Sequence, residues 1–205
     1  MVASWVKRNF DGIGVTQYRP GRHLGAVQDH YRGRALLCID VSPSMAGAPL
    51  RAAIAGGLDF LTEARDAYYE CGLVLWDDGV VAHLRTTSGD AAVRRRLRSA
   101  TIRWGTALAP TLRVAIKELG PMTGDRVVCV FSDGEITDTA LATKLAKRAR
   151  ALGIRFVVRG LGSGASRSLA RVLRPDGNDA AQTVRNVGDV RRGIASMVRE
   201  MRLGR

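Results

Sequence analysis

Residues 35–44 read Ala-Leu-Leu-Cys-Ile-Asp-Val-Ser-Pro-Ser, and this stretch decides the fold. Its first five residues form a continuous apolar run that ends at Asp40, a pattern typical of a buried strand. A polar loop with two serines follows, and leucine and isoleucine then recur at helical spacing from about Pro49 to Ala67. We therefore expect a strand, a loop and a helix, the opening unit of an α/β fold.

The same alternation continues outward from this stretch. Asp77-Asp78-Gly79 predicts a hairpin turn, so the strand after it should run antiparallel to the strand before it. Asp138 is expected to cap the helix that it precedes. The predicted fold class is α/β, with an open, mostly parallel central sheet, one antiparallel edge strand and helices on both faces. Further strands are predicted at 72–76, 80–84, 127–131, 154–158 and 183–187, and helices at 91–99, 108–119, 138–152, 166–173 and 190–201.

Length and composition favour one soluble domain. The chain has 205 residues, of which 46% are apolar and 25% charged, the usual balance of a globular protein. Residues 1–32 are polar, basic and weakly periodic, so we interpret them as an N-terminal extension of a domain at 33–205. The uncharged stretch 41–50 has about half the length of a membrane span. No membrane segment is therefore expected.

Two features favour the cytoplasm. No apolar segment follows Lys7 and Arg8, so no secretory signal is visible. Cys38, Cys71 and Cys129 each lie in an apolar run, which favours buried, reduced thiols.

The net charge of +13 is the unusual part of the composition. A basic surface of this kind favours polyanions or acidic protein partners. Aromatic residues make up 5% and do not alternate with the arginines, apart from Trp104 beside Arg103, so no base-stacking platform is evident. An acidic protein, a nucleic acid and a solvated arginine face all remain open. The basic residues gather in two clusters: Arg94, Arg95, Arg96, Arg98 and Arg103, and then Lys144, Lys147, Arg148, Arg150, Arg155 and Arg159.

Oxygen-bearing side chains follow two of the predicted strands and precede one helix. Ligands of open parallel sheets bind beyond the carboxyl ends of the strands, and alternate residues of an extended segment point the same way. Carboxylates and hydroxyls are hard ligands, suited to Mg²⁺, Mn²⁺ or Ca²⁺ rather than zinc. The sequence therefore predicts a divalent metal site built from Asp40, Ser42, Ser44, Thr106 and Asp133.

The ordered set Asp-x-Ser-x-Ser, Gly-Thr and Ser-Asp-Gly resembles the von Willebrand factor type A (vWA) domain with its metal-ion-dependent adhesion site. The resemblance covers about residues 33–203 and implies a Rossmann-like fold. Residues 39–45 and 131–134 look like the stand-alone bacterial members. Where the family more often has Gly-Gly-Thr, Trp104 replaces the first glycine. The resemblance implies that Ser42 and Ser44 bind the metal directly, Thr106 directly or through water depending on the state, and Asp40 and Asp133 directly or through water.

A binding module is expected rather than an enzyme. Nucleophilic attack by Ser42 or Ser44 would need a general base, and no histidine is close to either in sequence. Gly160-x-Gly162-x-x-Ala165 nominally fits a dinucleotide fingerprint, but it follows a late strand rather than the first strand of a βαβ unit.

We therefore expect a metal-dependent protein–protein interaction module that binds a partner carboxylate. The resemblance adds that small bacterial members work beside AAA+ ATPases of the MoxR type or in stress and conflict systems, which makes an ATPase adaptor the leading role. The alternative is a module associated with RNA or DNA through its arginine-rich face. The residues expected to contact the partner are Arg94, Arg95, Arg98, Arg103 and Trp104.

Overall fold

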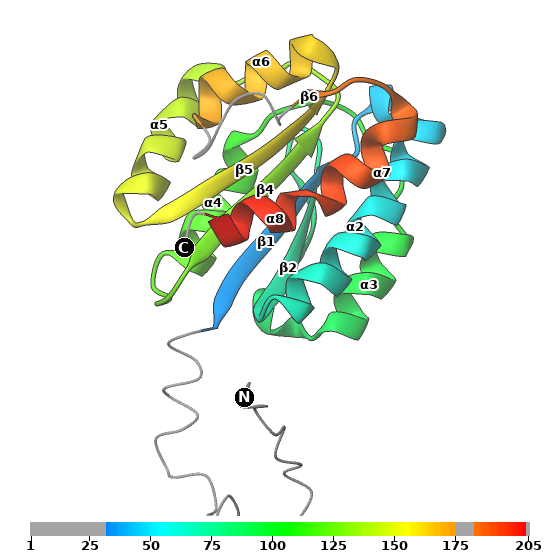
Figure 1. Ribbon diagram of the computed structural model, residues 1–205. Coiled ribbons are helices and arrows are strands. Elements are labelled where there is room, and N and C mark those ends of the chain that lie inside the picture. The colour runs from blue at the N-terminus through cyan, green and yellow to red at the C-terminus, as the bar shows by residue number, and fades with distance from the viewer. Residues whose placement is uncertain (1–31, 175–182, 204–205) are drawn as a thin grey trace, which may run out of the picture.

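The sheet at the centre of the computed structural model has the strand order β3-β2-β1-β4-β5-β6 among the described residues, 32–174 and 183–203 (Figure 1). Only β3 is antiparallel to its neighbour, and the others pair in parallel. The predicted fold class is confirmed. The strands are β1 (Gly33–Asp40), β2 (Tyr69–Trp76), β3 (Val80–Leu84), β4 (Arg126–Ser132), β5 (Ile154–Leu161) and β6 (Thr183–Val184).

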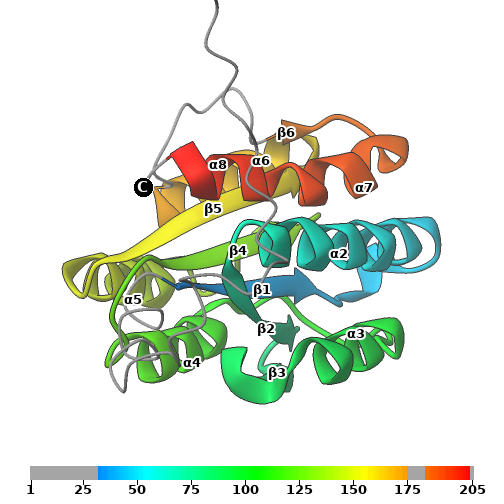
Figure 2. The ribbon, with the colours of Figure 1, turned by 60° about the horizontal axis from the view of Figure 1, so that its bottom comes forward.

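Helices cover both faces of the sheet, each over its own apolar core. The first core lies beneath α2, α3, α7 and α8. The second lies beneath α4, α5 and α6, so α2 and α4 lie on opposite sides of β1 (Figure 2). The helices are α2 (Ala48–Asp66), α3 (Asp90–Arg98), α4 (Ala109–Leu119), α5 (Thr139–Ala151), α6 (Gly162–Leu173), α7 (Val187–Ala195) and α8 (Met197–Leu203), with short 3₁₀ helices at Pro43–Met45 and Thr86–Ser88.

The end of the chain differs from the prediction in two ways. The strand expected at 183–187 is the two-residue β6, because α7 already begins at Val187. The single helix expected at 190–201 is two helices that meet at Ser196. The Ser196 hydroxyl donates to the Gly193 carbonyl at 2.8 Å, and the buried guanidinium of Arg159 donates to Ser196 Oγ at 3.1 Å. These side-chain bonds stabilise the break between α7 and α8.

The strand register brings the chemistry-bearing residues of two strands to one edge. Ile39 of β1 pairs with Phe131 of β4, so Asp40 and Ser132 follow side by side. Chain connections leave β1 and β4 in opposite directions along the sheet, which makes this edge a topological switch point. The predicted extension lies outside the described residues, except for Arg32. No helix in the described ranges is both long and apolar enough to cross a membrane.

Candidate metal centre

Asp40 is the buried base of the site. It ends β1 with no exposed surface, and its Oδ2 accepts a 2.6 Å hydrogen bond from the Ser132 hydroxyl at the end of β4. Its Oδ1 accepts from the backbone N–H of Ser42 at 2.8 Å. The second bond turns the chain directly after the strand. Together, the two bonds fix the carboxylate between β1 and β4.

Three further oxygen ligands meet above Asp40. Ser42 Oγ and Ser44 Oγ are 3.1 Å apart, and the Ser44 hydroxyl donates to Asp133 Oδ1 at 2.7 Å. In an octahedron with metal–oxygen bonds of about 2.1 Å, neighbouring ligands are about 2.9 Å apart. The three side chains therefore already have the spacing of adjacent ligands around Mg²⁺. The structure brings Asp40, Ser42, Ser44 and Asp133 together at the predicted edge.

Thr106 borders the same group from the loop before α4. A Cβ built on Gly134 would lie 3.5 Å from Thr106 Cγ2 and 4.0 Å from Ser44 Oγ. The backbone N–H of Thr106 donates to Asp78 Oδ1 at 3.1 Å, and its carbonyl accepts from the backbone N–H of Thr137 at 3.2 Å. The Thr106 backbone is thus held from two sides.

Gly105 gives the loop its path. Its φ is +104°, and a Cβ there would lie 1.8 Å from Asp78 Oδ1, so this position requires glycine. Trp104, the departure from the family pattern, lies before the strained position. The loop is also bonded to the strand ends, because Arg103 N–H donates to the Val41 carbonyl at 2.7 Å.

Asp138 has a role that the sequence did not reveal. It occupies the N-cap position of α5, but its carboxylate makes no capping bond to that helix. It accepts instead from the backbone N–H groups of Leu108 and Ala109 at 2.9 and 2.7 Å, so it caps the start of α4. The prediction that Asp138 caps its own helix is wrong. The partner lies about 30 residues away in sequence, and no local signal could have identified it.

The electrostatics of the site favour a cation. Burial raises the pKa of Asp40 to about 6, although hydrogen bonds from Ser132 and Ser42 lower it, and nearby Asp133 adds to the rise. Burial also raises the pKa of Asp133, partly offset by the hydrogen bond from Ser44. Two carboxylates and neighbouring hydroxyls form a donor set that fits a hard divalent ion. Within the described residues, no group of three or more His, Cys, Asp or Glu offers an alternative metal site.

Residues 35–135 match the family model of the von Willebrand factor type A domain. The chain contains a vWA domain. Domains of this family are generally protein–protein interaction modules. A search of curated proteins gave no match.

Solved vWA structures share the fold. The chain is similar to the vWF domain of the type V pili tip protein Mfa5 from Porphyromonas gingivalis, with 14% identity, a TM-score of 0.71, and coverage of 85% of this chain and 96% of that one. It is also similar to the conserved hypothetical protein BatB from Bacteroides thetaiotaomicron, at 18% identity, TM-score 0.66 and 83% and 99% coverage. For the pilus adhesin SpaC from Lactobacillus rhamnosus GG the values are 15%, 0.66, 83% and 30%. At these identities the likeness shows the fold alone.

The residues expected to contact a partner separate into two groups in this vWA domain. Arg103 and Trp104 belong to the loop beside the metal centre, and the Trp104 side chain is 81% exposed. Arg95 and Arg98 lie exposed on α3. Arg94 is different, because its guanidinium donates to Asp90 Oδ2 at 2.6 Å and to the Leu58 carbonyl at 3.2 Å. It therefore joins α3 to α2 instead of extending into solvent.

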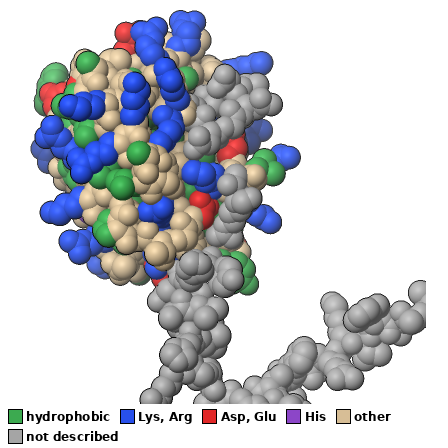
Figure 3. All heavy atoms as spheres, turned by 90° about the vertical axis from the view of Figure 1, so that its left-hand side faces the viewer, with side chains coloured by type: hydrophobic (Ala, Val, Ile, Leu, Met, Phe, Trp, Pro, Cys, Tyr) green, Lys and Arg blue, Asp and Glu red, His purple; other side chains and the backbone are tan. Residues whose placement is uncertain are grey.

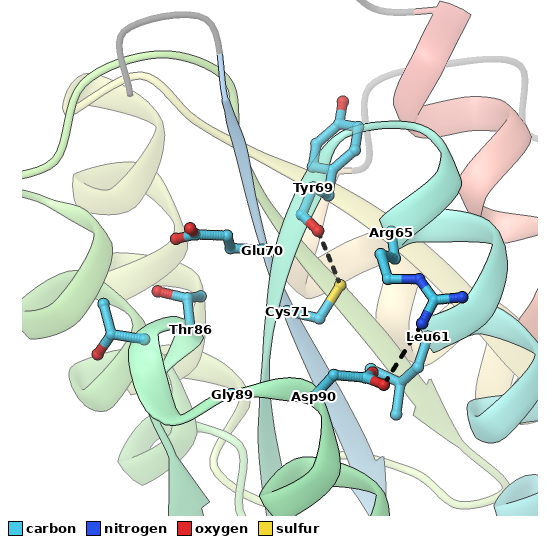
Figure 4. A pocket seen from close by; sticks show the side chains of 9 residues that line it. Leu61, Arg65, Tyr69, Glu70, Cys71, Thr86, Gly89 and Asp90 are labelled. Carbon is cyan, nitrogen blue, oxygen red and sulfur yellow. Dashed lines mark hydrogen bonds and ion pairs between the residues drawn. The ribbon is translucent and has the colours of Figure 1, made fainter. Parts of the chain in front are cut away.

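A pocket of about 300 Å³ lies at the opposite edge of the vWA sheet (Figure 4). None of the five predicted metal ligands lines it. Arg65 and Asp90 face each other across one side at 3.9 Å, and Cys71 lies between β2 and α2. Burial raises the pKa of the Cys71 thiol to about 12, so the thiol stays protonated and is a poor nucleophile.

Proposed function

We propose that this vWA domain is a metal-dependent protein interaction module that recognises a carboxylate of its partner. The observation that carries the proposal is the spacing of Ser42, Ser44 and Asp133, whose oxygen atoms lie 2.7 to 3.1 Å apart above the buried Asp40. Mg²⁺ is the proposed ion, with Mn²⁺ and Ca²⁺ as alternatives of the same hard class. The proposed ligands are Asp40, Ser42, Ser44, Thr106 and Asp133.

The chain's own residues divide the work between holding an ion and leaving it accessible. Asp40 and Ser42 are buried, whereas Ser44 is exposed and Asp133 half-buried. The site therefore opens to solvent on the side of Ser44 and Asp133. Two carboxylates balance the formal charge of a divalent ion, while hydroxyls donate charge weakly. When bound, the ion supplies a positively charged position that a partner carboxylate can occupy.

Arg103 and Trp104 suit the edge of such an interface. The exposed indole of Trp104 offers a large apolar contact, and tryptophan and arginine are the residues that most often dominate binding energy at protein interfaces. The positive charge of Arg103 favours an acidic partner. A carboxylate on the partner would thus meet the ion while its neighbours meet these two side chains.

We propose binding rather than catalysis at this centre. Activation of Ser42 or Ser44 as a nucleophile would require a general base within hydrogen-bond reach. His83 is the one histidine among the described residues, and its ring is hydrogen-bonded to the buried Glu118. This contact fixes the imidazole to α4.

The leading partner is an acidic surface of an AAA+ ATPase of the MoxR type in the cytoplasm. This part of the proposal is supported by the resemblance of residues 39–45 and 131–134 to stand-alone bacterial members. The pilus proteins among the similar structures show that the same fold also occurs in adhesins. Capture experiments with a metal requirement separate these roles.

Calorimetry with Mg²⁺ tests the site directly. Wild type should bind one ion, and Ser44→Ala and Asp133→Ala should weaken binding about tenfold or more, because each loses one ligand. Glu135→Gln is the matched control, since it removes an exposed carboxylate two residues from Asp133 but outside the ligand set. Equal heats from wild type and Asp133→Ala would refute the site. Partner capture should then require Mg²⁺ and fail in EDTA.

A further inference from the structure

The helix layer formed by α4, α5 and α6 has a surface charge of one sign. Figure 3 shows Lys and Arg side chains spread over the face that carries α5. Within these three described helices the one acidic residue is Glu118, which is buried. The exposed cations are Arg113, Lys117, Lys144, Lys147, Arg148, Arg167 and Arg171.

The opposite layer treats its cations differently. Arg94 of α3 pairs with Asp90 at 2.6 Å, and Arg191 of α7 pairs with Asp59 of α2 at the same distance. None of the seven cations on α4, α5 and α6 forms an ion pair or a side-chain hydrogen bond with another described residue. Like charges gathered in this way repel one another and add nothing to folding. An anionic partner would relieve the repulsion.

A groove of about 430 Å³ lies within this basic face, between α4 and α5. Leu152 at its edge is 39% exposed, although it is a large apolar side chain. The groove is apolar between charged walls: Ile116, Pro121, Leu145 and Leu152 line it together with Arg113, Lys117 and Arg148. Apolar surface surrounded by one sign of charge matches a partner that carries apolar side chains between carboxylates.

Two simpler explanations account for part of this surface. Lys117 and Arg148 lie in the last turns of α4 and α5, where cations stabilise the helix dipole. That reason does not extend to Arg113 or Lys144. A nucleic acid would use the positive charge, but no aromatic side chain lines the groove for stacking, and phosphates gain nothing from its leucines.

We propose that the groove between α4 and α5 is a second docking site, independent of the metal, that binds an acidic amphipathic helix of a partner protein. Apolar side chains of that helix would contact Ile116, Leu145 and Leu152, and its carboxylates would pair with Arg113 and Arg148. The groove lies at the C-terminal ends of α4 and α5, whereas the metal centre lies at their start. The 11 residues of α4 separate the two by about 16 Å.

A defined peptide tests the proposal in EDTA, so that the metal centre makes no contribution. The probe is a fluorescein-labelled, glutamate-rich helical peptide of about five turns, with leucines at i, i+4 and i+7. It should bind wild type, and in NMR spectra it should shift the methyl signals of Ile116, Leu145 and Leu152. A version with serine in place of leucine should bind about tenfold more weakly or worse.

Charge reversal at the walls supplies the second measurement. Arg113→Glu with Arg148→Glu should weaken binding of the leucine peptide about tenfold or more. Arg51→Glu with Arg199→Glu is the matched control, because it makes the same charge change at exposed positions of the opposite layer. Melting curves check that both variants fold, and the methyl shifts on wild type stand even where a variant does not.

Three results would overturn the proposal. Equal binding of the leucine and serine peptides would show a generic polyanion surface, as would equally tight binding of a duplex DNA of about 20 base pairs. Equal losses in the two charge-reversal variants would show that only net charge matters. Loss of peptide binding in Ser44→Ala would place the peptide at the metal centre, and an effect of that variant on Mg²⁺ calorimetry alone leaves the groove intact.

Discussion

Replacing Asp40 with asparagine should stabilise the metal-free protein at neutral pH. Asp40 has no exposed surface, and its pKa is raised from 3.8 to about 6, mainly by burial. A carboxyl group with a raised pKa in the folded state favours folding below its unfolded pKa and loses that contribution as the pH rises through the folded pKa. Above pH 6, the folded chain therefore holds a charged group that the unfolded chain would solvate better. An asparagine at this position carries no charge at any pH.

The size of the effect follows from the shift. A change of about two units at ~1.4 kcal/mol per unit corresponds to about 3 kcal/mol, present above pH 6 and reduced to less than about 1 kcal/mol by pH 4. For a domain of this length, that is a rise in melting temperature of about 6–12 °C at pH 7.5. The stabilisation appears only in EDTA, because a bound cation would neutralise the carboxylate of wild type.

The hydrogen bonds of Asp40 survive the change. The amide oxygen of the introduced asparagine can accept from the Ser42 N–H as Asp40 Oδ1 does at 2.8 Å. The amide nitrogen can donate to Ser132 Oγ, which then directs its own proton to the Gly134 carbonyl, 3.4 Å away. The substitution therefore removes charge without leaving a buried polar group unpaired.

Urea unfolding followed by circular dichroism measures the difference, at pH 4 and at pH 7.5 in EDTA. Asp66→Asn is the control, because it removes the same charge from a carboxylate with a 69% exposed side chain and should change the free energy of unfolding by no more than about 0.5 kcal/mol. Added Mg²⁺ should then stabilise wild type but not Asp40→Asn. Equal stability of the variant and wild type at pH 7.5, or the same difference at both pH values, would refute the reasoning.

Three further substitutions separate the loop, the cap and the interface. Gly105→Ala should weaken Mg²⁺ binding in calorimetry and lower the free energy of unfolding by about 1–3 kcal/mol, because φ is +104° and the new Cβ would meet Asp78; unchanged binding and stability would show that the loop tolerates a side chain. Asp138→Ala should lower the free energy of unfolding in urea by about 1–2 kcal/mol, since two N–H groups at the start of α4 lose their acceptor; no loss would mean that water replaces the carboxylate. Trp104→Ala should change stability by less than about 0.5 kcal/mol, because the side chain is 81% exposed. The same variant should lower affinity for a partner captured with Mg²⁺ by about tenfold, and wild-type affinity would exclude Trp104 from the interface.

The sequence was informative where structure depends on neighbouring residues. Buried parallel strands read as short apolar runs, so β1 and β4 were predicted within one or two residues of their observed ends. Asp40 and Asp133 were placed at one edge because parallel strands share the edge at which they end. The hairpin turn at Asp77-Asp78-Gly79 predicted the antiparallel β3. Each of these inferences needed a local pattern and one rule of sheet geometry.

The sequence failed where a side chain finds its partner across the fold. Arg94 was grouped with its neighbouring arginines, yet it bonds to Asp90 one turn earlier and to Leu58 of another helix. Asp138 was assigned to the helix that follows it, and it caps a different one. A charged residue next to a helix has several acceptors or donors within reach, and the packing of α4 against α5 decides among them. Sequence spacing contains no information about that packing.

The charge of the chain shows the same limit at a larger scale. A net charge of +13 predicts attraction to anions but not where they bind. The sequence drew attention to the arginines before Trp104, whereas folding gathers the unpaired cations on α4, α5 and α6. The reason is that the acids of α2, α3 and α7 lie within reach of the arginines in their own layer, and the only acid of α4 is turned inward to His83. Helix by helix, the two layers differ little in basic residues. They differ in where the acids lie, and the anion-binding face is therefore the one from which exposed acids are absent.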